Sequence, residues 1–128
     1  DSTLNLWNGA TEEKDGKLLM KVKGTELEFP ESMREKIKGH TGKEVSFGIR
    51  PEHISLGKEG EQNAQRGKML VKEQMGNEEI VYFESEGNQI TARLTLNQEE
   101  SLSLKESGIF KIDMEKCHLF DTDTEKVL

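Results

Sequence analysis

The sequence has few cysteines, prolines and aromatic residues, and it has no long apolar run. One cysteine, two prolines and 5% aromatic residues are present among 128 positions. The single cysteine, Cys117, excludes an intrachain disulfide framework and suits a reducing cytoplasm. No stretch approaches the roughly 18 consecutive apolar residues of a membrane-spanning helix, and the N-terminus lacks the charged-then-apolar order of a signal peptide. We therefore expect a cytoplasmic chain with no direct membrane insertion.

Positive charge is also in deficit. Eighteen Lys and Arg residues stand against 25 Asp and Glu, which gives a net charge of -7 with both signs interspersed. A negative surface opposes binding to phosphate backbones, and so few aromatic rings cannot form the stacking platform of single-strand-binding proteins. We expect no nucleic-acid partner.

The apolar residues that are present recur at every second position, which is typical of half-buried strands. This alternation is clear over residues 18–22, 45–49 and 90–94. Residues 80–83 are apolar on both faces, which predicts a central, well-covered strand. Turns between short strands are predicted at Asp15-Gly16, Gly76-Asn77 and Gly87-Asn88. The pattern favours an antiparallel barrel or sandwich.

One segment has helical spacing instead. Ser32 and Glu35 have the spacing of a capping box. Met33 and Ile37 share one helical face, which predicts a short helix over residues 33–38. The predicted fold class is therefore all-β with one short helix.

Two parts of the chain resemble one another. Phe47 to Glu52 aligns with Phe110 to Glu115, and a His-apolar pair follows each segment. The polar stretch from Gly57 to Gly67 has no apolar residue larger than alanine, so we expect an exposed connector there. We predict a single compact module that spans the whole chain (1–128) and has two related halves, at about 1–56 and 68–128.

No motif for catalysis is complete. Residues 39–44 (Gly-His-Thr-Gly-Lys-Glu) resemble a phosphate-binding loop, but Ile37 occupies the position of its first glycine. Glu44 follows the lysine, where magnesium needs a hydroxyl, and the segment lies after a helix and before a strand, the reverse of the required order. We predict no nucleotide site and no catalytic residue in this chain.

Candidate metal ligands are equally incomplete. Cys117 and His118 are adjacent, and neighbours in a strand point to opposite faces, so they cannot easily chelate one ion. Acidic residues 121–125 lack the glycine and the distal glutamate of a calcium loop. We expect no metal or other cofactor in this chain.

Arg50, Pro51, Glu52 and His53 gather a cation, an anion and an imidazole at a predicted strand end. An acid–base pair is conceivable there, but no nucleophile or second acid accompanies it. Pro51 ends the strand, and we expect the three polar side chains to satisfy the turn's own polar groups.

The segment Gly48-Ile49-Arg50-Pro51-Glu52-His53-Ile54 resembles the signature of the C-terminal domain of maltose and multiple-sugar ABC transporter ATPase subunits. Residues 4–9, 71–78 and 117–121 are similar to the same family's entry strand, second-barrel hairpin and final strand, in that order. The resemblance covers nearly the whole chain. It marks as structural signature residues Gly48, Arg50, Pro51, Glu52, His53, His118, Phe120 and Asp121.

The resemblance implies two interleaved barrels of the oligonucleotide/oligosaccharide-binding (OB) type, a TOBE domain. It implies a regulatory and dimerisation role in the ATPase subunit of a sugar importer, at the cytoplasmic face of the cell membrane. ATP and magnesium would belong to an upstream nucleotide-binding domain, and the start at Asp1 without methionine suggests a fragment that lacks it. The implied partners are a second copy of the chain, the ATPase domain, the transmembrane permease subunits and a regulator from the sugar phosphotransferase system.

Two alternatives stay open. Related barrels in molybdate transporters bind oxyanions, and residues 91–94 (Thr-Ala-Arg-Leu) faintly resemble their anion loops. A nucleic-acid-binding barrel is the other alternative, because fold alone does not fix function.

Overall fold

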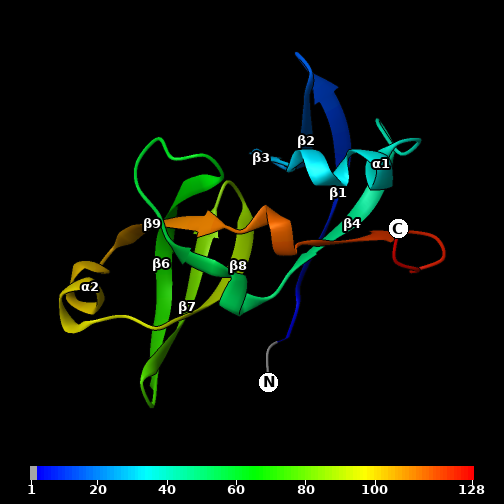
Figure 1. Cartoon of the computed structure of the whole chain (residues 1–128). Helices are drawn as coiled ribbons and strands as arrows, with labels where there is room; N and C mark the ends of the chain where they lie inside the picture. Colours follow the sequence, from blue (N-terminus) through cyan, green and yellow to red (C-terminus); the bar gives the residue numbers. More distant parts are fainter. Residues whose placement is uncertain (1–2) are drawn as a thin grey trace.

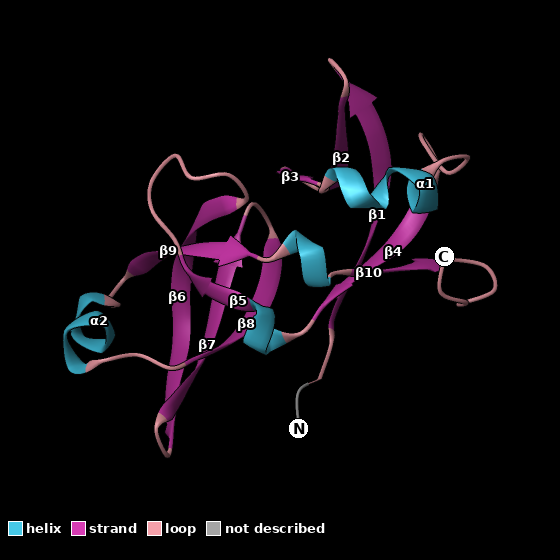
Figure 2. Ribbon diagram, in the orientation of Figure 1, coloured by secondary structure: helices cyan, strands magenta, loops and turns pink. Residues whose placement is uncertain are grey.

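The computed structural model describes residues 3–128, which form two five-stranded antiparallel sheets (Figure 1, Figure 2). The first sheet contains, in spatial order, β10 (His118–Asp121), β4 (Glu44–Ile49), β1 (Asn5–Lys14), β2 (Lys17–Val22) and β3 (Thr25–Glu28). The second sheet contains β5 (Ile54–Leu56), β9 (Ser107–Ile112), β6 (Ala64–Met75), β7 (Glu78–Ser85) and β8 (Asn88–Leu94). The predicted all-β class is confirmed.

Each sheet borrows one strand from the other part of the chain. β5 pairs with β9 in the second sheet, and β10 pairs with β4 in the first. In Figure 1 the C-terminal segment leaves β9 and crosses to the lobe that holds β4. The two barrels are therefore interleaved, as the resemblance implies. The division at about 1–56 and 68–128 stays a prediction.

The internal repeat is visible in the order of elements. β4 is followed by the 3₁₀ turn η2 (Pro51–His53) and by β5, while β9 is followed by the 3₁₀ turn η3 (Met114–Lys116) and by β10. The exchanged strands also pair in matching register, because Leu56 lies opposite Phe110 and Leu119 lies opposite Phe47. The similarity of the two sequence segments thus reflects a repeated strand–turn–strand unit.

One contiguous core joins the two sheets. Phe47, Phe83 and Phe110 are fully buried, and the rings of Phe83 and Phe110 stack with centroids 3.9 Å apart. Trp7 stacks on Phe47 and donates a hydrogen bond from Nε1 to the carbonyl of Gln89 in β8, so its indole ring also links the sheets. Alternating apolar residues in the strands supply this core, because successive side chains in a strand point to opposite faces.

The helical prediction is only partly right. Residues 31–33 form the 3₁₀ turn η1 (Glu31–Met33), and α1 (Arg34–Ile37) follows it. Neither element has a side-chain cap, so the predicted capping box is wrong. Proline at position 30 is extended and precedes η1 directly, which leaves Ser32 inside the turn and away from its N-cap.

A second helix was missed by the sequence pattern. α2 (Gln98–Ser103) begins after Asn97, whose Oδ1 accepts a hydrogen bond from the Glu100 N–H at 2.7 Å. Glu100 Oε1 accepts one in return from the Asn97 N–H at 3.0 Å. This is a complete capping box, and it stabilises a helix whose own residues are not buried. In the residues that the structure describes, no helix is long and apolar enough to cross a bilayer.

Two strand predictions also need correction. The connector predicted over residues 57–67 ends early, because β6 begins at Ala64 and Gly67 is buried in it. β7 is central, as expected, but one of its faces is only half covered: Ile80 and Tyr82 are half-buried, whereas Val81 and Phe83 are fully buried. A glycine can occupy a core position without any apolar side chain of its own, which explains the first error.

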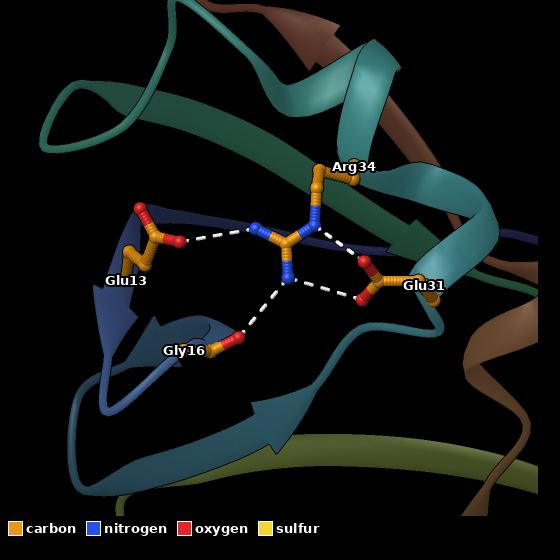
Figure 3. Close-up of polar contacts among 4 residues, drawn as sticks. All are labelled: Glu13, Gly16, Glu31 and Arg34. Atoms are coloured by element: carbon orange, nitrogen blue, oxygen red, sulfur yellow. Dashed lines mark hydrogen bonds and ion pairs between the residues drawn. The ribbon is translucent and has the colours of Figure 1, made fainter.

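Arg34 fastens α1 to the hairpin between β1 and β2 (Figure 3). Its guanidinium donates two hydrogen bonds to the Glu31 carboxylate, at 2.6 and 3.0 Å, and one to Glu13 at 3.0 Å. Nη2 of Arg34 also donates a fourth hydrogen bond, to the Gly16 carbonyl at 3.0 Å. Hydrogen bonding to Glu31, and then to Glu13, raises the pKa of Arg34, and the same pairing lowers the pKa of Glu31.

We expect Arg34→Met to loosen α1 without unfolding the sheets, because the methionine replaces the aliphatic stem of the side chain and removes all four hydrogen bonds of the guanidinium. Hydrogen exchange at the Lys38 amide, which donates to the Arg34 carbonyl in the helix, is the measurement. Lys36→Met in the same helix is the matched control and should leave this amide unchanged. Equal protection in both variants would contradict the role given to Arg34.

Candidate functional site

The signature turn η2 connects β4 to the exchanged strand β5. Arg50 is extended, and Pro51 is buried at the first position of the turn, where its missing N–H costs nothing. The His53 N–H donates to the Arg50 carbonyl at 2.9 Å, and the Asp113 N–H donates to the His53 carbonyl at 3.0 Å. The backbone of the first turn is thus bonded to the residue that precedes η3.

Within the described residues 3–128, no side chain caps this turn: Arg50 is exposed, and Nδ1 of His53 is buried without a hydrogen-bond partner. The structural role expected for these side chains stays a prediction. Glu52 points elsewhere, with its carboxylate 3.7 Å from Nη2 of Arg93 in β8. The turn's backbone groups pair with one another and with Asp113, which leaves Arg50 free for surface contacts.

A second group of signature residues lies on the outer face of the first sheet. Gly48 is opposite Leu6 in β1 and His118 in β10. A Cβ at Gly48 would come within 2.8 Å of the end of the Leu4 side chain, which would then have to shift. His118 stacks on Phe120, with ring centroids 6.3 Å apart. These residues lie where the exchanged strand β10 pairs with β4 of the first barrel.

Asp121 closes the turn that follows β10. Its Oδ1 accepts hydrogen bonds from the N–H groups of Asp123 and Thr124, at 2.8 and 2.9 Å. These bonds, with that from Thr124 the strongest, lower the pKa of the Asp121 carboxyl. The chain then returns so that Val127 pairs with Phe120. Asp121 therefore positions the C-terminal segment along the outer edge of β10.

Cys117 is buried against Met33, with 3.6 Å between Sγ and the Met33 sulfur. Burial raises the pKa of its thiol to about 12. Among residues 3–128, no three His, Cys, Asp or Glu side chains converge on a point where a metal ion could be held. The thiol acts as a small apolar group of the core.

Cys117 is expected to react at least about a hundredfold more slowly with a disulfide thiol reagent in the folded chain than in concentrated guanidinium chloride, because the reactive thiolate is suppressed by its raised pKa and by burial. Absorbance of the released reagent at mildly alkaline pH measures the rate. The measured rate belongs to Cys117 alone, because the chain has a single cysteine. Similar rates in both conditions would show that the folded chain opens readily around Cys117.

Two asparagines, neither of them predicted from the sequence, clamp the barrels together. Nδ2 of Asn5 donates to the Thr91 carbonyl at 2.9 Å, and Oδ1 of Asn5 accepts from the Thr91 N–H at 2.9 Å. Asn63 pairs in the same way with Glu28, at 2.9 Å and 2.7 Å. Asn5 opens β1 and reaches β8, whereas Asn63 precedes β6 and reaches β3. Each barrel therefore holds a strand of the other through a side-chain amide.

Beside the Asn5 clamp lies a hollow of about 890 Å³, which we call the Arg93 groove. It lies over the half-covered face of β7, between the N-terminal segment and the tip of the β6–β7 hairpin. Arg93 is 3.6 Å from the Glu78 carboxylate through Nε. The lining residues are Thr3, Leu4, Asn5, Pro51, Glu73, Gln74, Met75, Gly76, Glu78, Ile80, Tyr82, Thr91 and Arg93.

Comparison with known families accounts for most of the chain. Residues 3–54 match the family described as MalK OB fold domain, and residues 47–120 match the TOBE domain. The two matches overlap across Phe47–Ile54, which contains the signature turn.

Individual relatives agree with these families. The oligosaccharides import ATP-binding protein MsmX of Bacillus subtilis is 34% identical over an alignment of 117 residues that covers 84% of this chain and 30% of that protein. The maltose/maltodextrin import ATP-binding protein MalK of Vibrio cholerae is 31% identical over 84 residues, 64% of this chain and 22% of that protein. The chain thus spans less than a third of the length of these relatives.

A solved structure shares the fold. The cytoplasmic molybdate-binding protein ModG superposes with a TM-score of 0.66 over 90% of this chain and 94% of its own, at 18% sequence identity. Its likeness supports the interleaved architecture and nothing further. The TOBE match alone covers more than half of the sequence, and so the chain belongs to the TOBE domain family, with a MalK-type OB fold in its N-terminal part.

Proposed function

We propose that this chain is the C-terminal regulatory domain of the ATP-hydrolysing subunit of a sugar ABC importer. The observation that carries the proposal is the pair of overlapping matches to the MalK OB fold and TOBE domains, together with relatives named as sugar-import ATP-binding proteins. ATP, magnesium and hydrolysis belong to the nucleotide-binding domain of the parent subunit. That subunit works on the cytoplasmic face of the membrane with permease partners.

The surface of the chain supports a role in contacts. Arg50 projects from the signature turn, and Leu6 is 55% exposed beside the half-buried rings of His118 and Phe120. These residues can meet a second copy of the domain or a regulator from the sugar phosphotransferase system. No part of this role needs chemistry in the chain itself.

The direct test is a chimera in which this chain replaces the matching part of the Bacillus subtilis MsmX protein. We expect the chimera to restore oligosaccharide import in cells that lack MsmX, because the interleaved barrels should seat on the ATPase domain as the native ones do. A matched chimera in which Gly48→Val fills the place of Leu4 should import less. A chimera that is stable and hydrolyses ATP but never supports import would overturn the proposal.

Homodimerisation is a separate expectation of the same proposal. We expect a weak, concentration-dependent dimer that strengthens modestly with salt, because the net charge of -7 on each copy is repulsive and salt screens it. Sedimentation equilibrium at two salt concentrations measures both effects. A strict monomer at millimolar concentration would count against a dimerising role.

Oxyanion binding is the weaker alternative. Its support is the shared fold with ModG. The one arginine of the 91–94 segment, Arg93, already faces the carboxylates of Glu52 and Glu78, which oppose an anion. Dialysis against molybdate, tungstate and sulfate, followed by measurement of bound metal and sulfur, distinguishes the two functions.

A further inference from the structure

We propose that the edge of β6 from Val71 to Met75 is a docking site for an extended segment of another protein, which joins the second sheet as an additional antiparallel strand. The segment that fits this edge carries a basic residue between two apolar residues at alternate positions. The inference does not depend on the function proposed above, because it rests on the pairing and the side chains of β6.

The second half of β6 is paired on one side only. β9 pairs with β6 from Ala64 to Lys68, and β7 pairs with it from Lys68 to Met75. A bulge between Met69 and Val71 separates the two parts of the strand. Beyond the bulge β6 runs past α2 to the tip of its hairpin with β7 (Figure 1). Within residues 3–128, no strand pairs with the edge opposite β7 over residues 71–75.

The direction of the backbone groups on this edge follows from the hairpin. Its two-residue turn, Gly76-Asn77, places Met75 opposite Glu78. Residues that flank such a turn exchange both backbone hydrogen bonds, and so does every second pair after them. Lys72 and Gln74 belong to the intervening pairs, so their N–H and C=O groups point away from β7. In the described part of the chain these groups have no hydrogen-bond partner, and an added strand can pair with them.

The side chains on the outer face of this edge are apolar, acidic and apolar in turn. Val71 is 51% exposed and Met75 is 59% exposed, and Glu73 lies between them on the same face. Toward an added strand these are non-hydrogen-bonded positions, where opposing side chains lie closest. Lys72 points to the other face, where its Nζ donates to the Ser101 carbonyl at 2.8 Å. The complementary segment therefore has apolar residues opposite Val71 and Met75 and a basic residue opposite Glu73.

A second copy of this chain does not fit the edge. Paired with itself through the outward groups, β6 would bring Glu73 opposite Glu73 or Lys72 opposite Lys72, and like charges directly opposite are destabilising. A third register, centred on Gln74, pairs only residues 73–75, because β6 ends at Met75. The net charge of -7 on each copy adds to the repulsion. These charges favour a different protein with a basic segment.

The test is a titration of the isotope-labelled chain with the capped peptide Val-Thr-Lys-Thr-Val, followed by NMR. We expect saturable shifts at the amides of Lys72 and Gln74. Bound peptide should slow hydrogen exchange at both amides by at least about tenfold, because these outward N–H groups gain an acceptor. The peptide with glutamate in place of lysine should bind about three- to tenfold more weakly. The peptide with both threonine nitrogens methylated should not bind, because it cannot donate to the edge.

Two variants of the chain separate the role of the backbone from that of the charge. Gln74→Pro removes one outward N–H, and proline is tolerated in an edge strand where its nitrogen faces solvent. It should weaken peptide binding by at least about fivefold, whereas the matched control Gln74→Thr, which keeps the N–H, should not. Glu73→Lys should reverse the preference, so that the glutamate peptide binds more tightly than the lysine peptide. This variant decides the question if Gln74→Pro disturbs the hairpin, which shifts at the Val81 amide would reveal.

Several outcomes would overturn the proposal. Absence of saturable shifts at Lys72 and Gln74 would mean that the bulge and the charges close this edge to partners. Equal binding of the methylated and unmethylated peptides, or an unchanged preference in Glu73→Lys, would also contradict it. Protection of the Lys72 amide that rises with chain concentration alone would assign the edge to a second copy. None of these outcomes affects the chimera experiment, which tests the function proposed above.

Discussion

Asn63→Ala is expected to lower the free energy of unfolding by about 2–3 kcal/mol, a large share of the stability of a small domain. The alanine removes both side-chain hydrogen bonds to the backbone of Glu28 and leaves its N–H and C=O without their partner. Asn63 also has a positive φ of 61°, which asparagine tolerates better than alanine. Chemical denaturation, monitored by the fluorescence of Trp7, measures the loss.

Further variants separate these causes. Asn63→Gly relieves the backbone conformation but still lacks the amide, so it should recover only the conformational part of the loss. Asn5→Ala should cost a similar amount at the other clamp, where Thr91 loses both of its partners. Asn77→Ala at the exposed hairpin tip is the control and should change stability by less than about 0.5 kcal/mol. Equal values for Asn63→Ala and Asn77→Ala would show that the clamp is not a stabilising element.

The two asparagine clamps could not be predicted from the sequence. Strand periodicity predicted β2, β4 and β8, because the side chains of a half-buried strand alternate whatever its partner. An asparagine carries no such pattern. Asn5 and Thr91 are 86 positions apart, and nothing in either neighbourhood indicates that β8 approaches the start of β1. The repeated segments indicated two related halves, and the exchange of strands between them was implied by the family resemblance.

The two capping-box positions show how local context decides a local motif. Ser32 and Glu35 have the required spacing, but Pro30 immediately precedes a 3₁₀ turn and Ser32 is not at a helix start. Asn97 and Glu100 have the same spacing and form the complete box. The first segment has the buried apolar pair Met33 and Ile37, whereas no residue of α2 is buried, so hydrophobic periodicity favoured the segment without the box. The distinguishing feature is Pro30, which takes the N-cap position of the first segment.

The surroundings of the signature residues depend on tertiary contacts that the sequence does not show. Pro51 and Gly48 are buried where the barrels join, whereas Arg50 is exposed and Glu52 faces Arg93. Backbone bonds from Asp113, in the second half of the chain, satisfy the turn that the side chains were expected to satisfy.

Gly67→Ala is expected to destabilise the chain by about 3 kcal/mol, through overpacking. Gly67 lies in β6 opposite Gly108 of β9, and a Cβ there would overlap Cδ2 of the Phe83 ring. Phe83 is fully buried and stacked on Phe110, so its ring cannot move aside without displacing the centre of the core. Denaturant unfolding measures the change, and the slope of the transition should stay the same if only packing is affected.

A double variant tests this explanation directly. Phe83→Leu alone should destabilise the core by leaving a cavity, but in combination with Gly67→Ala the smaller side chain gives the new methyl group room. The combined loss should therefore be smaller than the sum of the single losses by more than about 1 kcal/mol. Gly24→Ala is the matched control: its Cβ would meet only the exposed side chain of Glu86, at 2.8 Å from the carboxylate, which can move away, and at 3.3 Å from Cβ. Additive losses in the double variant would mean that Gly67 is required for the backbone of β6 itself, and that Phe83 does not limit the residue at this position.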